Sequence, residues 1–486
     1  MTETDYQLII GGRRRPGGAG SYEIRNPATE ELVGLAPEAS AEDALDAAKA
    51  AEDAFPAWSR TAPEERSRLL ARVAELVDQH RDELVPLVQA ETGATLRVAK
   101  TMQVPVCAER FRRYARGALE ATRIPIQPTE QPGSALAPGA LMSAVAVRRP
   151  VGVVACITPY NFPIVNMAGK IGPALAMGNT VVVKPAPQDP LAVIRLVELM
   201  EDAGFPPGVA NVVTGSAGAL GEALVTSPEV DMISFTGSTA VGTRIAEAAG
   251  QGMKRLLLEL GGKGASLVFD DADVEAAVAA MGSTWAFHSG QICTAPTRVV
   301  AQRGVYDEVV DRLAKMAAQL QVGDPLAPDT VVGPLISARH RDRVESYVRI
   351  GLDEGATLAA GGERPDLPRG FYAAPTLLAD CSNDMTVAQE EIFGPVLVAL
   401  PFDDDEEGIA IANGTPYGLY DYVWTGDSQR AFAIAGRLRT GNVGLNTVQR
   451  NLEAPFGGSK MSGVGRDGGS FGLHAYSELQ SVVWAG

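Results

Sequence analysis

Short apolar runs and amphipathic stretches alternate through the middle of the chain, between residues 150 and 250. The apolar runs are rich in β-branched residues, which is typical of strands buried on both faces of a sheet. Repeated strand–helix units predict a parallel, doubly wound sheet, whose ligands bind at the carboxyl ends of the strands. The predicted strands and helices, in alternation, are 151–157, 165–177, 179–185, 190–203, 209–213, 219–226, 231–237 and 239–249.

Two further regions complete the α/β pattern. Residues 40–120 have apolar positions at helical spacing, with Ser40 as a helix cap and the acidic Glu42 and Asp43 in the first turn. Residues 262–450 form a second α/β stretch. Its helices are expected at 273–286, 304–321 and 337–353.

Residues 123–149 and the C-terminal tail differ from these compact units. The first half of 123–149 is rich in proline and glycine, and the second half alternates weakly. The tail sequence "YSELQSVVW" at 476–484 also alternates, which indicates a strand. A terminal strand that pairs with an extended arm would leave open edges suited to subunit assembly.

Composition narrows the class of protein. With 486 residues, two or three domains are expected, and 46 % hydrophobic residues are ordinary for a soluble fold. A net charge of −17 argues against nucleic-acid and anionic-membrane partners. The acidic N-terminus lacks signal-peptide features, and no apolar run is long enough to span a bilayer. We therefore expect a cytoplasmic protein with no membrane or nucleic-acid partner.

The four cysteines, Cys107, Cys156, Cys293 and Cys381, are far apart in the sequence and form no CxxC motif. A disulfide scaffold is not expected from this spacing. The four histidines are equally scattered, so no metal site is predicted. For Cys293, in "HSGQICTAPTR", two readings stay open at this point: a small buried apolar side chain or a nucleophile.

Polar residues at predicted strand ends are candidates for chemistry. "FTGSTAVG" at 235–242 is either a structural turn or a phosphate site at a helix start. Lys184 can reach a ligand or lie in solvent, and Glu259, within an apolar strand end, is either a general base or half of a salt bridge. Asn161, held between two prolines, can stabilise an oxyanion or bond its own backbone.

Together these segments resemble the NAD(P)-dependent aldehyde dehydrogenases over nearly the whole chain, in the hydrolytic branch that releases a carboxylic acid. The resemblance implies a doubly wound cofactor domain (1–127 and 150–261), an α/β catalytic domain (262–461) and a β oligomerisation arm (128–149 and 462–486). It also implies a homodimer or homotetramer. The motifs, in family order, are "NPATEE" (26–31), "TPYNFP" (158–163), "VVVKP" (181–185), "GFPPGVANVVTG" (204–215), "FTGSTAVG" (235–242), "ELGGK" (259–263), "GQICTA" (290–295), "EEIFGPV" (390–396) and "PFGGSKMSGVGRDGG" (455–469).

The resemblance also implies roles for single residues. Cys293 would attack the aldehyde carbon, Asn161 and the Cys293 N–H would stabilise the oxyanion, and Glu259 would activate the hydrolytic water. Lys170 and Asp467 match positions that would relay a proton from this base. NAD or NADP would be held by Thr158, Pro159, Tyr160, Lys184, Gly237, Ser238, Thr239, Gly242, Leu260, Gly261, Glu391 and Phe393.

Several positions depart from the family pattern. Pro187 replaces a frequent Glu that would repel a 2′-phosphate, so we expect both cofactors to be accepted. His288 replaces a common Asn, and is either a second ionisable group near the thiol or a loop histidine bonded to backbone. Gly169 replaces a Trp of some members, which predicts a wider substrate funnel. The expected substrate pocket comprises Phe162, Gly169, Arg450 and Phe456.

Two alternative functions follow from the same motifs. Relatives that transfer the acyl group to CoA typically lack the base, so Glu259 argues against that activity. A non-catalytic relative would typically lose the nucleophile or the base, whereas Asn161, Glu259 and Cys293 are all present. Arg450 makes the pocket entrance polar, which suits an acidic or hydroxylated aldehyde, although an ordinary surface arginine or a bulky aromatic substrate fits the sequence as well.

Overall fold

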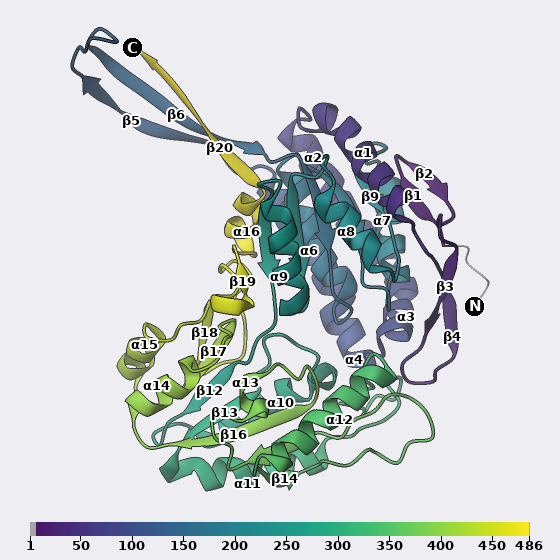
Figure 1. Cartoon of the computed structure of the whole chain (residues 1–486), viewed down its shortest axis with the longest axis vertical. Helices are drawn as coiled ribbons and strands as arrows, with labels where there is room; N and C mark the ends of the chain where they lie inside the picture. The colour runs from purple at the N-terminus through teal and green to yellow at the C-terminus, as the bar shows by residue number, and fades with distance from the viewer. Residues whose placement is uncertain (1–5, 486) are drawn as a thin grey trace.

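The computed structural model describes residues 6–485 and contains two α/β units and a projecting arm (Figure 1). Each α/β unit is built on its own largely parallel sheet, and the arm is a separate antiparallel sheet. The predicted fold class, a doubly wound parallel sheet with a second α/β unit and a β arm, is confirmed. Among the described residues, no helix combines the length and apolar character needed to cross a bilayer.

The first sheet has eight strands in the order β19-β11-β10-β7-β8-β9-β1-β2. Its five central strands, from β11 to β9, run parallel. β19 pairs antiparallel with β11 at one edge, and at the other side β1 pairs antiparallel with both β9 and the edge strand β2. The strands are β1 (Leu8–Ile10), β2 (Arg13–Arg15), β7 (Val153–Ile157), β8 (Thr180–Lys184), β9 (Ala210–Val212), β10 (Met232–Thr236), β11 (Arg255–Glu259) and β19 (Gly463–Val464).

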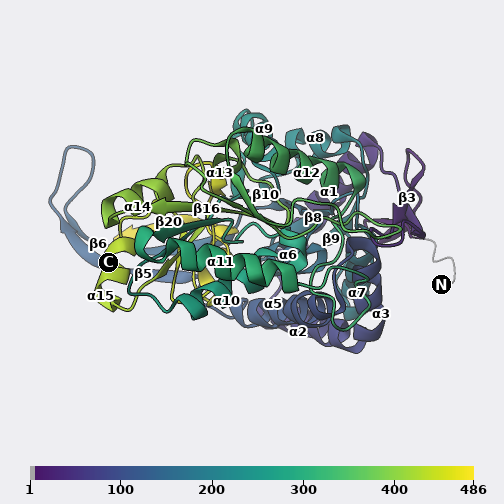
Figure 2. The same cartoon turned by 90° about the horizontal axis from the view of Figure 1, so that it is seen from below.

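Helices cover both faces of this sheet, as the apolar, two-sided strands require (Figure 2). One face carries α1 (Ala41–Trp58), α8 (Gly218–Thr226) and α9 (Thr239–Gly250). The other face carries α2 (Pro63–Gln79), α3 (Arg81–Thr92), α4 (Leu96–Val98), a π-helical turn (Ala99–Gln103), α5 (Val104–Gly117), α6 (Pro163–Ala176) and α7 (Leu191–Ala203). At the start of α1, Ser40 caps the helix, as the sequence predicts, and the Asp43 carboxylate in turn accepts from the Ser40 N–H.

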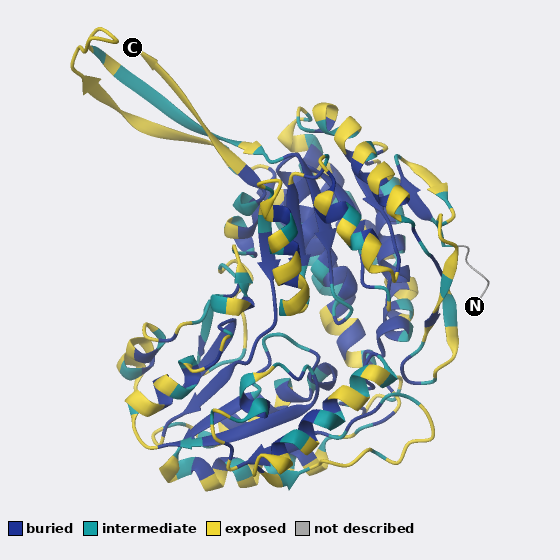
Figure 3. Cartoon of the chain, in the orientation of Figure 1, coloured by how far each residue is buried: buried dark blue, intermediate teal, exposed yellow. Residues whose placement is uncertain are grey.

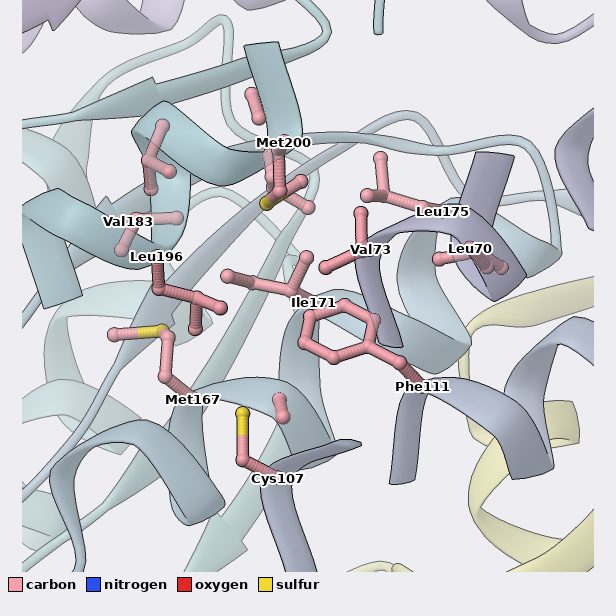
Figure 4. Close-up of a cluster of buried hydrophobic side chains, with 14 of the residues drawn as sticks. Leu70, Val73, Cys107, Phe111, Met167, Ile171, Leu175, Val183, Leu196 and Met200 are labelled. Atoms are coloured by element: carbon pink, nitrogen blue, oxygen red, sulfur yellow. The ribbon is translucent and has the colours of Figure 1, made fainter. Parts of the chain in front are cut away.

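The larger core of the first unit lies between α2, α5, α6 and α7 and the sheet (Figure 4). Phe111 of α5 and Ile171 of α6 are fully buried there beside Val73 of α2. Cys107 is buried in the same cluster, so this cysteine serves as a small apolar side chain. The packed core fixes α5 and α6 against each other. It therefore also fixes where the side chains near the ends of these helices lie.

The second sheet has seven strands in the order β14-β15-β16-β13-β12-β17-β18, all parallel except β14. Its strands are β12 (Ala265–Val268), β13 (Arg298–Gln302), β14 (Thr357–Ala360), β15 (Thr376–Ala379), β16 (Val396–Phe402), β17 (Tyr420–Trp424) and β18 (Asn442–Leu445). Its helices are α10 (Val274–Trp285), a 3-10 turn (Phe287–Gly290), α11 (Arg303–Gln319), α12 (Ala338–Asp353), α13 (Thr386–Gln389), α14 (Asp405–Asn413), α15 (Ser428–Ala435) and a 3-10 turn (Lys460–Ser462).

The arm consists of β5 (Arg123–Gln131), β6 (Ala140–Pro150) and β20 (Ser477–Ala485), in the order β20-β6-β5. The C-terminal strand pairs antiparallel with β6 along its full length, from Ser477 opposite Pro150 to Ala485 opposite Met142. Strands β5 and β20 are almost entirely exposed, and Trp484 has 48 % of its surface in solvent (Figure 3). The arm therefore presents apolar side chains that no other part of the chain between residues 6 and 485 covers.

The observed sheets differ at two places from the domain boundaries predicted from the sequence. The arm strand begins at Arg123 and not at residue 128. Residues 463–464 pair with β11 of the first sheet, and α16 (Gly469–Ala475) packs against α5 and α6, so this part of the 462–486 segment lies outside the arm. A short two-stranded sheet, β3 (Ser21–Arg25) and β4 (Leu32–Pro37), lies at the outer side of the first unit.

Candidate active site

The strand order of the first sheet creates a crevice between β7 and β10. From β7 the chain builds outward through β8 and β9, then returns to the other side of β7 to add β10 and β11. Loops therefore leave β7 and β10 in opposite directions at their carboxyl ends, which is where open α/β sheets bind ligands. Thr158 follows β7, Lys184 ends β8, and Gly237 follows β10. The structure thus brings three predicted cofactor residues to one edge.

The start of α9 forms one wall of this crevice. The Ser238 side chain caps the helix by accepting from the Val241 N–H, and Ser238 itself is exposed. Gly242 lies against Leu260, where an added Cβ would be 2.4 Å from Leu260 Cδ2, so the glycine allows α9 to approach β11 closely. Thr239 Oγ1 donates to the Met461 carbonyl at 3.2 Å. The exposed helix N-terminus is a ready anion site.

Lys184 and Thr158 offer polar atoms without strong partners. Burial lowers the pKa of Lys184 to about 8, a shift opposed by Glu38, and its Nζ makes only a 3.4 Å contact with the Pro185 carbonyl. Thr158 Oγ1 is buried and has no hydrogen-bond partner within residues 6–485. These two groups, with Pro159 beside them, suit the hydroxyl and phosphate oxygens of a nucleotide.

Glu391 and Phe393 come from the second unit and face the first. Glu391 Oε1 accepts from the Gly262 N–H at 3.0 Å, and loss of water around the carboxyl raises its pKa to about 7. A Cβ on Gly261 would lie 2.2 Å from Glu391 Oε2, so a larger residue would displace this carboxylate from its position. Phe393 has a left-handed backbone (φ 60°) and meets the Tyr160 ring edge-on at 6.0 Å.

The Cys293 loop is fixed by the neighbouring motifs. Its carbonyl oxygen lies over Gly262, where an added Cβ would approach to 2.6 Å. Gly290 is left-handed (φ 71°), and a Cβ there would be 2.2 Å from the Gly394 carbonyl. Tyr422 Oη donates to the Thr294 carbonyl at 2.7 Å. The "ELGGK", "GQICTA" and "EEIFGPV" motifs therefore form one contiguous structure.

As a whole residue Cys293 is half-buried, whereas Cys107, Cys156 and Cys381 are buried. Burial raises the pKa of the Cys293 thiol to about 12, the Arg450 charge opposes this shift, and the Glu391 and Glu259 charges add to it. In this state the sulfur is a protonated thiol, so a nucleophilic role requires a base or a change of environment on ligand binding.

Asn161 is buried in the loop that follows β7, and both its side chain and its backbone carbonyl are hydrogen-bonded. Its side-chain Nδ2 donates to the Gln291 carbonyl at 2.7 Å, two residues before Cys293. Its own carbonyl accepts from Gln103 Nε2 at 3.0 Å and from His288 Nε2 at 2.7 Å. The amide is therefore fixed to the nucleophile loop, with a second N–H left to donate.

The sequence left two roles open for His288, and the structure favours the histidine that is bonded to backbone. It is buried, its backbone is left-handed (φ 50°), and its ring lies 5.1 Å from that of Phe162. Burial lowers its pKa to about 4, which the bond to the Asn161 carbonyl opposes. At neutral pH His288 is an uncharged donor that positions Asn161.

Glu259 ends β11 and is 4 % exposed. Neither carboxylate oxygen has a hydrogen-bond partner in the described chain. Burial and the Asp467 charge raise its pKa well above the ordinary value, and Lys170 opposes this shift. Lys170 Nζ in turn donates to Ser234 Oγ at 3.1 Å. A desolvated carboxyl of this kind is poised to take up a proton.

The expected substrate pocket needs one correction. Phe162 and Phe456 are both half-buried, and the Arg450 guanidinium lies 3.7 Å from the centre of the Phe456 ring. Gly169 does not open the funnel as predicted: a Cβ there would lie 1.8 Å from Arg110 Nη1. The space that a larger side chain would use is filled by Arg110 from α5.

Three residues of the site were not predicted: Gln103, Gln291 and Arg110. Gln291 stands within the quoted "GQICTA" motif, so its neighbourhood to Cys293 was a usable signal. Gln103 lies in the π-helical turn before α5, and Arg110 is one of several arginines on that helix. Nothing in the local sequence separates Arg110 from them; only the packing of α5 on α6 does.

Comparison with known proteins agrees with this geometry. The model of the aldehyde dehydrogenase family matches residues 15–482. Betaine aldehyde dehydrogenase of Bacillus subtilis is 40 % identical over 94 % of this chain and 93 % of its own. The 3-succinoylsemialdehyde-pyridine dehydrogenase of a Pseudomonas species is 40 % identical, covering 99 % of this chain and 98 % of its own.

A solved structure is similar along the whole fold. Betaine aldehyde dehydrogenase of Staphylococcus aureus, determined in complex with NAD+, has a TM-score of 0.94 and 34 % identity, covering 98 % of this chain and 94 % of its own. The family match and the identity of the relatives extend well beyond the site motifs, through both sheets and the arm. This chain belongs to the aldehyde dehydrogenase family.

Proposed function

We propose that this chain oxidises an aldehyde to a carboxylic acid with NAD+ or NADP+, through a thioester on Cys293. The observation that carries the proposal is the link between Asn161 and the nucleophile loop. A buried amide donates to the Gln291 carbonyl beside a half-buried cysteine, and the Glu259 charge acts on that thiol. This combination supplies an oxyanion donor, a nucleophile and a base in one place.

The first half of the reaction forms a bond between Cys293 and the substrate. The thiol proton passes to a base, and the sulfur attacks the aldehyde carbon to give a thiohemiacetal oxyanion. The second Asn161 N–H and the Cys293 backbone N–H donate to this oxygen. When bound, the oxidised nicotinamide supplies the hydride acceptor that turns the adduct into a thioester.

The second half releases the acid. Glu259 takes a proton from a water molecule, which attacks the thioester carbon and expels the Cys293 thiolate. The raised pKa of Glu259 suits this role. The Asp467 charge adds to the rise, and the charges of Lys170, Arg450 and Arg466 oppose it. We propose that Lys170 and Asp467 help to move the proton away from Glu259. The oxygen added to the aldehyde therefore comes from water.

The crevice beside β7 and β10 fits a dinucleotide. Ser238 and the start of α9, with Gly237 and Gly242, would hold the pyrophosphate; Lys184 would hold the adenosine ribose; and Glu391 would hold the nicotinamide ribose, with Phe393 against the ring. Thr158–Tyr160, Thr239, Leu260 and Gly261 would border the cofactor. Pro187 gives no carboxylate to repel a 2′-phosphate, so we propose that both NAD+ and NADP+ are used.

The test is a set of aliphatic, aromatic and semialdehyde substrates, each with NAD+ and NADP+, followed by absorbance of the reduced cofactor. We expect acid to form without CoA and Cys293→Ala to lose activity. Activity retained by Cys293→Ala would refute the proposed nucleophile. An absolute requirement for CoA would show that the thioester is released by acyl transfer to CoA and not by hydrolysis. Glu259 would then not serve as the base for water.

We also propose that the arm joins copies of this chain into a homodimer or homotetramer. Its strands have open edges and exposed apolar side chains, including Leu479, Val483 and Trp484. A long, exposed edge strand is stable in solution when another strand or surface covers it. A second copy, carrying the same arm, meets this need by symmetry.

A further inference from the structure

The outer part of the proposed substrate pocket is rich in arginine. Arg110, Arg113 and Arg116 of α5 and Arg450 of the loop after β18 line one hollow, together with Phe456 and the acidic residues Glu109, Glu453 and Asp467. Arg113 is paired with Glu120 and Glu453, and Arg116 with Glu109. The side chains of Arg110 and Arg450 have neither an ion pair nor a hydrogen bond to any residue of the described chain. Two of the four guanidinium groups therefore have no carboxylate within ion-pair distance.

The position of Arg110 depends on the glycine beneath it. Its Nη1 occupies the place where a side chain at position 169 would begin. Gly169 is on α6, the helix that starts directly after Asn161. With any larger residue at 169, the Arg110 guanidinium would have to leave this position. The pair Gly169 and Arg110 thus sets a positive charge into the substrate side of the pocket.

Arg450 lies closer to the reacting atoms. Its guanidinium packs on the Phe456 ring at 3.7 Å, an arrangement that holds the flat group in one orientation while its N–H edges stay free. Its charge opposes the rise in the pKa of the Cys293 thiol. Loss of surrounding water and then the charge of Arg110 lower the pKa of Arg450, although Arg450 is still exposed to solvent. An anion between the two guanidinium groups would relieve this repulsion.

We propose that Arg110 and Arg450 bind a carboxylate on the tail of the substrate, so that this enzyme acts on aldehydes that carry a second, acidic end. This inference rests on the proposed aldehyde oxidation. Guanidinium groups match a carboxylate through paired, charge-assisted hydrogen bonds. The same charges repel a cationic tail, so aldehydes with a quaternary ammonium group are poor substrates. Phe162 and Phe456 pack against the apolar carbon chain between the two ends.

The decisive experiment compares two substrates of equal shape. One is glutaric semialdehyde; the other is its neutral analogue, in which an isopropyl group replaces the carboxylate. We expect kcat/KM to be about tenfold or more higher for the acidic aldehyde, mainly through a lower KM. Arg110→Gln is expected to remove most of this preference, and Arg110→Lys to keep part of it. The Arg450→Gln variant tests the second proposed carboxylate-binding residue in the same way.

The measured quantity is the ratio of kcat/KM for the two substrates, because a general loss of activity cancels in it. This matters for Arg450, whose charge also acts on the Cys293 thiol. Arg112→Gln is the matched control: it removes one positive charge from the same helix, but from a residue that lies outside the hollow and is already paired with Asp78, and it should leave the ratio unchanged.

Three results separate the hypotheses. Equal kcat/KM for the acidic and neutral aldehydes would overturn the carboxylate site while leaving aldehyde oxidation intact. The same ratio in wild type and Arg110→Gln, with both proteins folded and binding cofactor equally, would overturn the role of Arg110. Oxidation of neither substrate, nor of any aldehyde in the wider set, would instead refute the proposed function.

Discussion

Replacing His288 by Asn tests whether this histidine acts as a buried neutral donor or as a titrating group of the reaction. The wild-type ring is 2 % exposed and donates from Nε2 to the Asn161 carbonyl. Its backbone is left-handed, a conformation that Asn tolerates better than most residues. The substitution therefore removes the ionisable ring with little backbone strain.

The size of the effect follows from the pKa. Burial lowers the pKa of His288 from 6.5 to about 4. As the pH falls below 6.5, the unfolded chain takes up a proton at this site while the folded chain does not, so stability is lost between pH 6.5 and pH 4. Linkage gives a loss of about 2 kcal/mol at pH 5 and about 3 kcal/mol at pH 4. Above pH 7 the histidine contributes no pH dependence.

The variant lacks this penalty at low pH. At pH 8 it should be less stable than wild type by about 1 kcal/mol, the usual contribution of a hydrogen bond. At pH 5 that difference should vanish or reverse. With an unfolding entropy of about 2 cal/mol/K per residue over 486 residues, about 2 kcal/mol corresponds to a change of about 2 °C in the difference between the two Tm values.

The assay is thermal unfolding of both proteins from pH 8 to pH 5, with the pH–rate profile measured on the same samples. We expect the Tm difference to narrow as described, and the apparent pKa values of kcat/KM to be the same in both proteins. A constant Tm difference would show that His288 is protonated in the fold. An apparent pKa that disappears in the variant would place His288 in proton transfer and refute the positioning role.

Other substitutions probe the remaining parts of the site. Glu259→Gln should form the thioester but hydrolyse it slowly, so a burst of reduced cofactor is followed by a turnover about a hundredfold or more below wild type; full steady-state activity would exclude Glu259 as the base. Gly262→Ala places a Cβ 2.6 Å from the Cys293 carbonyl and should displace the nucleophile loop, with a large fall in kcat. Pro187→Glu should lower kcat/KM for NADP+ more than for NAD+, and an unchanged ratio would show that position 187 does not face the ribose. Trp484→Asp should shift the protein to a smaller species in light scattering if the arm joins subunits.

Much of the fold was predictable because the spacing of apolar residues along the chain reflects which faces of a helix or strand are buried. Strands such as β7 and β8, buried on both faces, read as continuous β-branched runs, and α1 carries its cap at Ser40. The boundaries near the C-terminus were less predictable. Residues 463–464 form a two-residue strand whose only partner is β11, some 200 positions earlier. No local pattern encodes such a distant pairing.

The site was predictable where a motif and its partner are both fixed by backbone geometry. At Gly262 no larger residue fits beside the Cys293 carbonyl, and Gly261 lets the Glu391 carboxylate approach the strand end. Sequence alone left the two readings of His288 open, because its ionisation depends on burial. The surrounding packing, and not the loop itself, holds this ring in its neutral form.

Substrate choice shows most clearly what a sequence pattern omits. In the sequence, Gly169 stands out only as a residue without a side chain, which predicts a wider funnel. In the fold, the same absence admits a guanidinium from a neighbouring helix, so we propose a funnel that is charged and not wider. Arg110 has this role because α5 packs on α6 through the core around Phe111 and Ile171, while Arg113 and Arg116 on the same helix meet carboxylates. The specificity of such a pocket is therefore a property of two residues together, one of which contributes by being small.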